Sequence, residues 1–280
     1  MPLRLRDGVR LDNAVQQLRG CATRLGNVLG GSAGTEVSVH QNRYLSQVEA
    51  VEAQLRNIFT DPGVWNHLYG DRYWAIRSLT SSSIRPMPLI NDEAADQGRY
   101  IEYLMERLKR FQERLSGAPG EIAVLDTHVL LHYMPPSQID WREVLTLDTI
   151  RLVLPLRVVE ELDMTKYRAR DDLADRARRL LSDLWKLLAP TGGAPAPVPD
   201  RPGVTIEVPV DDEPRQRSLD ADEEILGECM ALKAVGTPVR LVTGDTGMSI
   251  RATGRGITVV QMPDQYLRRR PTHDSGPGGI

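Results

Sequence analysis

Only two cysteines, Cys21 and Cys229, occur among the 280 residues of the chain. They lie far apart and belong to no CxxC or Cys/His spacing, which argues against a disulfide framework and against a zinc site. We expect each to be a buried structural thiol. No apolar run reaches the roughly 18 residues that cross a bilayer. The amino terminus has basic residues but no apolar core behind them, so no signal peptide is predicted and a cytoplasmic location is expected.

The sequence also lacks a GxxxxGK[ST] loop, which excludes a P-loop ATPase. Neither sign of charge dominates, since charged residues make up 26% of the chain and its formal net charge is −3. This balance neither supports nor excludes a nucleic-acid partner, because phosphate-facing charge can be local. With 41% hydrophobic residues, the chain can build one large domain or two ordinary ones.

Helical periodicity dominates the first 118 residues. Within 100–115, apolar side chains recur at spacings of three and four, namely Ile101, Leu104, Met105, Leu108, Phe111 and Leu115. Further helices are predicted at 41–59 and, interrupted near Gly70, at 64–79. The segment SGAPG (116–120) ends this pattern. We predict an all-α N-terminal domain over residues 1–118, whose apolar stripes pack against the rest of the chain, mediate homodimerisation or bind a protein partner.

The hydrophobic pattern changes after the SGAPG segment. Short apolar runs, typical of strands, occur at 122–126, 151–155, 204–208, 239–243 and 257–261. Long helical patterns lie between some of them, at 156–188 and 222–235. Strands separated by helices predict an α/β domain over 119–268, with a mostly parallel sheet flanked by helices. Residues 189–203 read as a flexible proline-rich loop, and residues 269–280 as a disordered tail.

Two aspartates follow separate predicted strands. Asp126 closes the first strand, and Asp245 comes just after the strand at 239–243, between Gly244 and Gly247, which let the backbone turn sharply. Ligands of open α/β sheets bind beyond the carboxyl ends of the strands, so both carboxylates are well placed for a site. Either aspartate alone could instead be the N-cap of the helix that follows it.

Further acids stand at two helix starts, where the helix dipole alone would favour them. Glu160 and Glu161 follow the second strand, and Asp220, Asp222, Glu223 and Glu224 precede the last long helix. Carboxylates from separate elements at one sheet edge would repel one another unless a cation lay among them. Oxygen ligands without a Cys/His cluster suit Mg²⁺ or Mn²⁺. The pattern therefore predicts a metal-dependent phosphotransfer site.

Four motifs resemble those of a PIN domain, and more narrowly those of PhoH-type and related bacterial proteins. They occur in the expected order as VLDTHVLLH, VLPLRVVEELDMTK, DADEEIL and LVTGDTGM, and together they cover roughly half of the chain. The resemblance implies a PIN-like parallel sheet carrying the site of a metal-dependent endoribonuclease that cleaves single-stranded RNA. One departure is His128, which stands where many members have Asn.

The resemblance also selects among the acids. It implies that the catalytic residues and metal ligands for Mg²⁺ or Mn²⁺ are Asp126, Glu161, Asp222 and Asp245. It further implies that the hydroxyls of Thr127 and Thr243 support these acids.

Basic residues follow Glu161 along the next helix. Lys166, Arg168 and Arg170 lie nearest the predicted site and have few acidic partners at helical spacing, so we expect them to contact RNA phosphates. The later arginines Arg176, Arg178 and Arg179 alternate with acids such as Asp172 and Asp175, which is typical of an internally paired, solvated face.

Several functions other than that of a nuclease are alternatives for this sequence. A PIN fold with little or no hydrolysis could serve as an RNA-binding or protein-interaction module. A haloacid-dehalogenase-type phosphatase needs a second Asp where His128 stands, and a Toprim-type site leaves Asp126 without a role. A toxin of a toxin–antitoxin pair would leave the helical N-terminal domain unexplained.

Overall fold

The structure is a computed structural model that describes residues 4–29, 36–80, 82–168, 172–209 and 220–268. The predicted tail at 269–280 lies outside these residues. The chain folds into two compact units. Of the described residues, those up to Ala118 and Met230–Thr237 form the first unit, while the second contains the rest.

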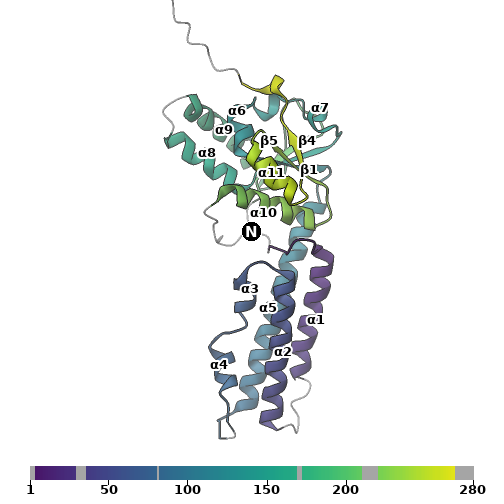
Figure 1. Ribbon diagram of the computed structural model, residues 1–280, viewed down its shortest axis with the longest axis vertical. Helices are drawn as coiled ribbons and strands as arrows, with labels where there is room; N and C mark the ends of the chain where they lie inside the picture. The colour runs from purple at the N-terminus through teal and green to yellow at the C-terminus, as the bar shows by residue number, and fades with distance from the viewer. Residues whose placement is uncertain (1–3, 30–35, 81, 169–171, 210–219, 269–280) are drawn as a thin grey trace, which may run out of the picture. The chain divides into compact units, whose positions relative to one another are not determined.

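Three long helices and two short ones build the first unit, shown in purple to blue in Figure 1. The long helices are α1 (Leu11–Leu29), α2 (Val37–Ile58) and α5 (Pro86–Ser116), and each contacts the other two. The short helices α3 (Pro62–Asn66) and α4 (Asp71–Arg77) both contact α2. They flank Gly70, which confirms the interruption predicted there.

Buried side chains recur along the long helices with alternating spacings of three and four, the heptad pattern of helices packed nearly in line. In α1 this stripe consists of Leu11, Ala14, Leu18, Cys21, Leu25 and Val28. The stripe predicted in 100–115 is buried too, except that Met105 is only half-buried. The helices predicted at 41–59 and 100–115 are confirmed, although α5 begins much earlier, where Pro86 starts its first turn.

The second unit contains one six-stranded sheet with the order β3-β4-β2-β1-β5-β6. All neighbours pair in parallel except β3 with β4. The strands are β1 (Glu121–Leu125), β2 (Ile150–Val153), β3 (Ala196–Pro197), β4 (Val204–Glu207), β5 (Val239–Thr243) and β6 (Thr258–Gln261). Every predicted strand is thus confirmed.

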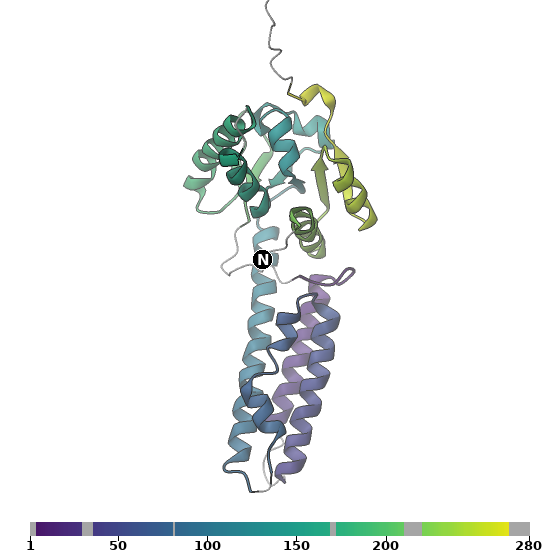
Figure 2. The ribbon, with the colours of Figure 1, turned by 60° about the vertical axis from the view of Figure 1, so that its left-hand side comes forward.

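Helices connect and cover the parallel strands, as predicted. Figure 2 shows the pair α8 (Leu156–Arg168) and α9 (Asp172–Leu188) on one side of the strands and α11 (Thr246–Gly254) on the other. The short helices α6 (Thr127–His132) and α7 (Trp141–Leu145) follow β1, and α10 (Ala221–Ala234) precedes β5. Because both faces are covered, β1 and β2 are almost entirely buried.

Two predicted segments differ from the structure. The helical pattern at 156–188 forms two helices, α8 and α9, rather than one. The proline-rich segment at 189–203 is not a loop throughout, because Ala196 and Pro197 pair antiparallel with β4. Proline is tolerated there since β3 is an edge strand and needs no full set of amide donors.

Both cysteines are free and buried, as predicted. Among the described helices, none combines the length and the apolar character that crossing a membrane requires.

A buried ion pair joins β2 to β4 within the sheet. The Arg151 guanidinium donates to Oε1 of Glu207 from Nε at 3.0 Å and from Nη2 at 2.6 Å. The two side chains are only 1% and 6% exposed. Loss of the carboxylate would therefore leave a guanidinium charge deep inside the sheet.

We expect Glu207→Ala to lower the free energy of unfolding by about 3–5 kcal/mol, because it removes one partner of a buried ion pair. Urea unfolding followed by circular dichroism would measure the change. Glu121→Ala provides the control, since Glu121 pairs with Arg240 across β1 and β5 but is 33% exposed. A loss of less than about 1 kcal/mol is expected there. Equal losses in the two variants would contradict the assigned role of the buried pair.

Candidate active site

The chain reverses its direction across the sheet next to β1. From β1 it proceeds outward through β2 to β4, and it then returns to place β5 and β6 on the other side of β1. Such a switch point opens a crevice beyond the carboxyl ends of the strands. Asp126 directly follows β1, and Asp245 follows β5 by two residues. The fold thus brings the two strand-end aspartates to the crevice.

Asp126 caps a helix and also contacts β5. Its Oδ1 accepts a hydrogen bond of 2.8 Å from the Val129 amide, so it is the N-cap of α6. Its Oδ2 accepts a hydrogen bond from the hydroxyl of Thr243. The in-register pairing of Leu125 with Val242 makes this contact possible, since it sets Asp126 beside Thr243. Asp126 is only 4% exposed.

Asp245 is linked to Asp126 through the same threonine. The Asp245 amide donates to Oγ1 of Thr243 at 2.9 Å, while that hydroxyl donates to Asp126. Asp245 is also the N-cap of α11, because its Oδ1 accepts from the Met248 amide at 2.8 Å. Its side chain is exposed to solvent. The N-cap role that each aspartate could have on its own is therefore present, together with the proximity that a site requires.

Glu161 joins this group from α8. Its Oε2 accepts a hydrogen bond from the hydroxyl of Thr127, the residue after Asp126. A continuous chain of contacts thus runs from Glu161 through Thr127, Asp126 and Thr243 to Asp245. Five of the residues predicted for the site lie together.

The surroundings of Asp126 disfavour its ionised form. Burial raises the pKa of its carboxyl from 3.8 to about 6, and the nearby charge of Asp245 contributes in the same direction. Hydrogen bonds from Thr243 and Val129 and the ring of His128 oppose the rise. A divalent cation between Asp126 and Asp245 would favour the ionised carboxylate.

Asp222 does not join this chain of contacts. It forms an ion pair with Arg251 of α11, which also lies 3.3 Å from Oδ2 of Asp220. The neighbouring acids of α10 are paired as well: Glu223 with Arg255 at 2.7 Å and Glu224 with Arg157 at 3.4 Å. From the sequence alone, the repulsion between these carboxylates is expected to require a bound cation. In the structure, the arginines neutralise their negative charge instead.

The fold around Gly244 explains why no side chain is present there. Its φ is not positive, so the sharp turn expected from the glycine is not the reason. A Cβ at this position would lie 2.7 Å from both Nδ1 of His128 and the hydroxyl of Tyr133. Buried Nδ1 of His128 has no hydrogen-bond partner among the described residues. His128 therefore packs beside the site at the position where many PIN domains have Asn.

The predicted phosphate contacts receive little support. Lys166 is paired with Asp163 and lies 4.8 Å from the ring of Tyr167, so the expectation that it has few partners is wrong. Arg168 ends α8, and Arg170 lies outside the described residues. On α9, Arg176 pairs with Asp172 as the spacing predicts, whereas Asp175 pairs with Arg178.

A divalent metal fits part of the predicted ligand set. Asp126, Glu161 and Asp245 supply hard oxygen donors from three elements at one crevice, which suits Mg²⁺ or Mn²⁺. Among the described residues, however, no three His, Cys, Asp or Glu side chains are already arranged as a ligand group. The three acids would have to draw together around the ion, and Asp222 would have to leave Arg251.

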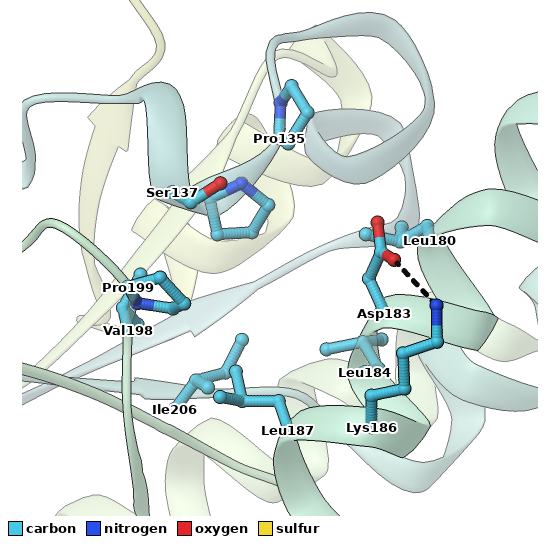
Figure 3. A pocket seen from close by; sticks show the side chains of 11 residues that line it. Pro135, Ser137, Leu180, Asp183, Leu184, Lys186, Leu187, Val198, Pro199 and Ile206 are labelled. Carbon is cyan, nitrogen blue, oxygen red and sulfur yellow. Dashed lines mark ion pairs between the residues drawn. The ribbon is translucent and has the colours of Figure 1, made fainter.

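A cavity of about 330 Å³ lies elsewhere in the second unit (Figure 3). It is lined mainly by apolar side chains of α9, of η1 (Pro136–Gln138) with the preceding Pro135, and of the β3–β4 region. Its one acid, Asp183, lies 4.0 Å from Lys186. Since none of the predicted site residues lines this cavity, it is not the centre of the proposed chemistry.

A parallel α/β sheet with carboxylates at its switch point defines a class of acid-based sites that suit metal and phosphate chemistry. The family follows from the sequence match: residues 123–263 match the family described as PIN domain, and the chain belongs to this family. PIN domains are commonly nucleases and generally use divalent metal ions. No curated protein matches the chain.

Asp126→Asn should stabilise the protein in EDTA at pH 8. The folded-state pKa of Asp126 is raised, so its contribution to stability is present below pH 3.8 and is lost as the pH rises through about 6. Above that pH the ionised carboxylate costs up to about 3 kcal/mol, which the amide avoids. Chemical unfolding of the variant and of wild type at pH 8 and at pH 4 would measure the difference in their free energies of unfolding.

Asp245→Asn is the matched control, since it removes an exposed carboxylate of the same acidic pair. Asp245→Asn should raise the free energy of unfolding at pH 8 by less than Asp126→Asn does. A destabilised Asp126→Asn variant at pH 8 would contradict the electrostatic account of this residue.

Proposed function

We propose that the protein is a metal-dependent endoribonuclease that hydrolyses phosphodiester bonds of single-stranded RNA. The observation that carries this proposal is the contact chain of Glu161, Thr127, Asp126, Thr243 and Asp245 at the switch point of the sheet. Membership of the PIN domain family supports it further. Single-stranded RNA is the proposed partner, and Asp126, Glu161, Asp222 and Asp245 are the proposed ligands of Mg²⁺ or Mn²⁺.

When bound, the metal would lower the pKa of a water molecule and offset charge on the phosphate oxygens. The chain's own residues position the ligands. Thr243 fixes Oδ2 of Asp126 and receives the Asp245 amide, so it holds the two aspartates at a set separation. Thr127 orients Glu161 toward the same crevice. Asp126 and Asp245 also use one carboxylate oxygen each for helix capping, which prevents free rotation of their side chains.

A second candidate is a PIN domain that binds RNA or a protein with little or no hydrolysis. The pairing of Asp222 with Arg251 favours it, because that acid is neutralised within the chain. The incomplete ligand group among the described residues favours it as well. The two candidates differ in whether Mn²⁺ elicits cleavage.

With Mn²⁺ present, wild-type protein should cleave a labelled single-stranded RNA, and Asp126→Asn and Asp245→Asn should each lose about a hundredfold or more of that activity. Denaturing gel electrophoresis of the products would measure it. Asp183→Asn is the control, because Asp183 is an exposed acid outside the site, and it should retain activity. Equal products from wild type and the two site variants would reject the nuclease proposal.

Arg251→Gln should strengthen Mn²⁺ binding about threefold. In wild type the metal must break the exposed ion pair between Arg251 and Asp222, which costs about 0.2–1 kcal/mol. The variant lacks this ion pair. Electron paramagnetic resonance of free Mn²⁺ would measure the affinity. The control is Arg255→Gln, which removes the same charge from the end of the same helix but frees Glu223 rather than Asp222. If both variants change the affinity equally, Asp222 is not a ligand that Arg251 withholds.

A further inference from the structure

Three arginines from distant parts of the sequence converge at the C-terminal end of α6. Arg176 and Arg179 lie on α9, and Arg268 follows η3 (Asp264–Tyr266). Together they form a group that we call the arginine cluster. None of the proposed catalytic steps uses these residues.

Hydrogen bonds to two successive carbonyls place the Arg176 side chain and the Arg268 backbone beside the end of α6. Nη1 of Arg176 donates to the Leu131 carbonyl at 3.2 Å, and the amide of Arg268 donates to the His132 carbonyl at 3.0 Å. An antiparallel bridge between Tyr133 and Leu267 holds the two chain segments together. Arg179 is one helical turn after Arg176 and is exposed. The fold therefore sets Arg176 and Arg268 at the same end of α6, and helix periodicity places Arg179 on the Arg176 side of α9.

The positive charge of the arginine cluster is only partly compensated. Asp172 pairs with Arg176, whose side chain is 11% exposed. Within the part of the chain that the structure describes, neither Arg179 nor Arg268 forms an ion pair with a carboxylate. Burial and the charges of Arg176 and Arg179 lower the pKa of Arg268, and the charge of Asp172 opposes this only in part. Helix capping accounts for Arg176, but it does not explain why two further guanidiniums are held beside it.

We propose that the arginine cluster binds a backbone phosphate of single-stranded RNA on one side of the bond that is cleaved, an inference that rests on the proposed function. Guanidinium groups match phosphate oxygens in charge and in hydrogen-bond geometry. Arg179 and Arg268 supply the donors, while Arg176 is engaged with Asp172 and with the Leu131 carbonyl of α6.

The position of α6 connects the arginine cluster to the acids. This helix begins after Asp126, its N-cap, and ends at His132, so its six residues span about 9 Å. A stacked strand advances about 3.4 Å per nucleotide, so the arginine cluster lies about three nucleotides from Asp126. The rings of His128 and His132, 4.5 Å apart, lie along this path. RNA that follows α6 would thus meet both sites.

Binding of a fluorescein-labelled 12-nucleotide single-stranded RNA in EDTA tests this inference without cleavage. We expect the double variant Arg179→Gln/Arg268→Gln to raise Kd about tenfold or more, since each guanidinium contributes charge-assisted hydrogen bonds. The slope of log K against log salt should become shallower by about 0.7, because one phosphate contact is lost. Fluorescence anisotropy at several salt concentrations would measure both quantities.

The control is Arg178→Gln/Lys186→Gln, which likewise removes two cations, but ones that lie on α9 and are both paired with acids. It should leave the salt slope unchanged. Equal effects of the two double variants, or no RNA binding by wild type, would overturn the inference. Mn²⁺-dependent cleavage by wild type is measured separately. If cleavage is absent but the binding difference is found, the arginine cluster stands as an RNA-binding site and the proposed nuclease function fails.

Discussion

The parallel pairing of β1 with β5 is the contact on which the candidate site depends. Its register places Val242 beside Leu125, so the next residues, Asp126 and Thr243, meet across the strand ends. A shift of one residue would turn Thr243 to the other face of the sheet and separate it from Asp126. Both strands are packed on their two faces, so a slip would disrupt the fit of their side chains against the covering helices.

Helix capping and site formation use the same carboxylates without conflict. Asp126 and Asp245 each commit one oxygen to the first turn of the helix that follows. Capping restrains the side chain and gives the unpaired amides of the helix a partner. The cost is electrostatic, since burial opposes ionisation of Asp126. A fold that keeps an acid in such a position, beside a second acid, is well suited to receive a cation.

The sequence predicted the strands and the site residues near them because short apolar runs and strand-end acids are local patterns. Asp126, Glu161 and Asp245 come together as the order of elements required. Through-space partners were not predictable in this way. Arg251 of α11 pairs with Asp222 of α10, and the Arg268 amide donates a hydrogen bond to the His132 carbonyl at the end of α6, so no spacing in the sequence signals either contact. Edge strand β3 was missed because Pro197 and the prolines around it indicate a loop.

The central claim is that Asp126, Glu161 and Asp245 hold a divalent ion. Anomalous diffraction from a crystal soaked in Mn²⁺ tests it most directly, because the signal locates the metal independently of activity. We expect an anomalous peak within coordination distance of these three acids, about 2.0–2.3 Å, with Asp222 turned away from Arg251. A well-diffracting, Mn²⁺-soaked crystal without a peak among these acids, or with Mn²⁺ bound only elsewhere, would contradict it.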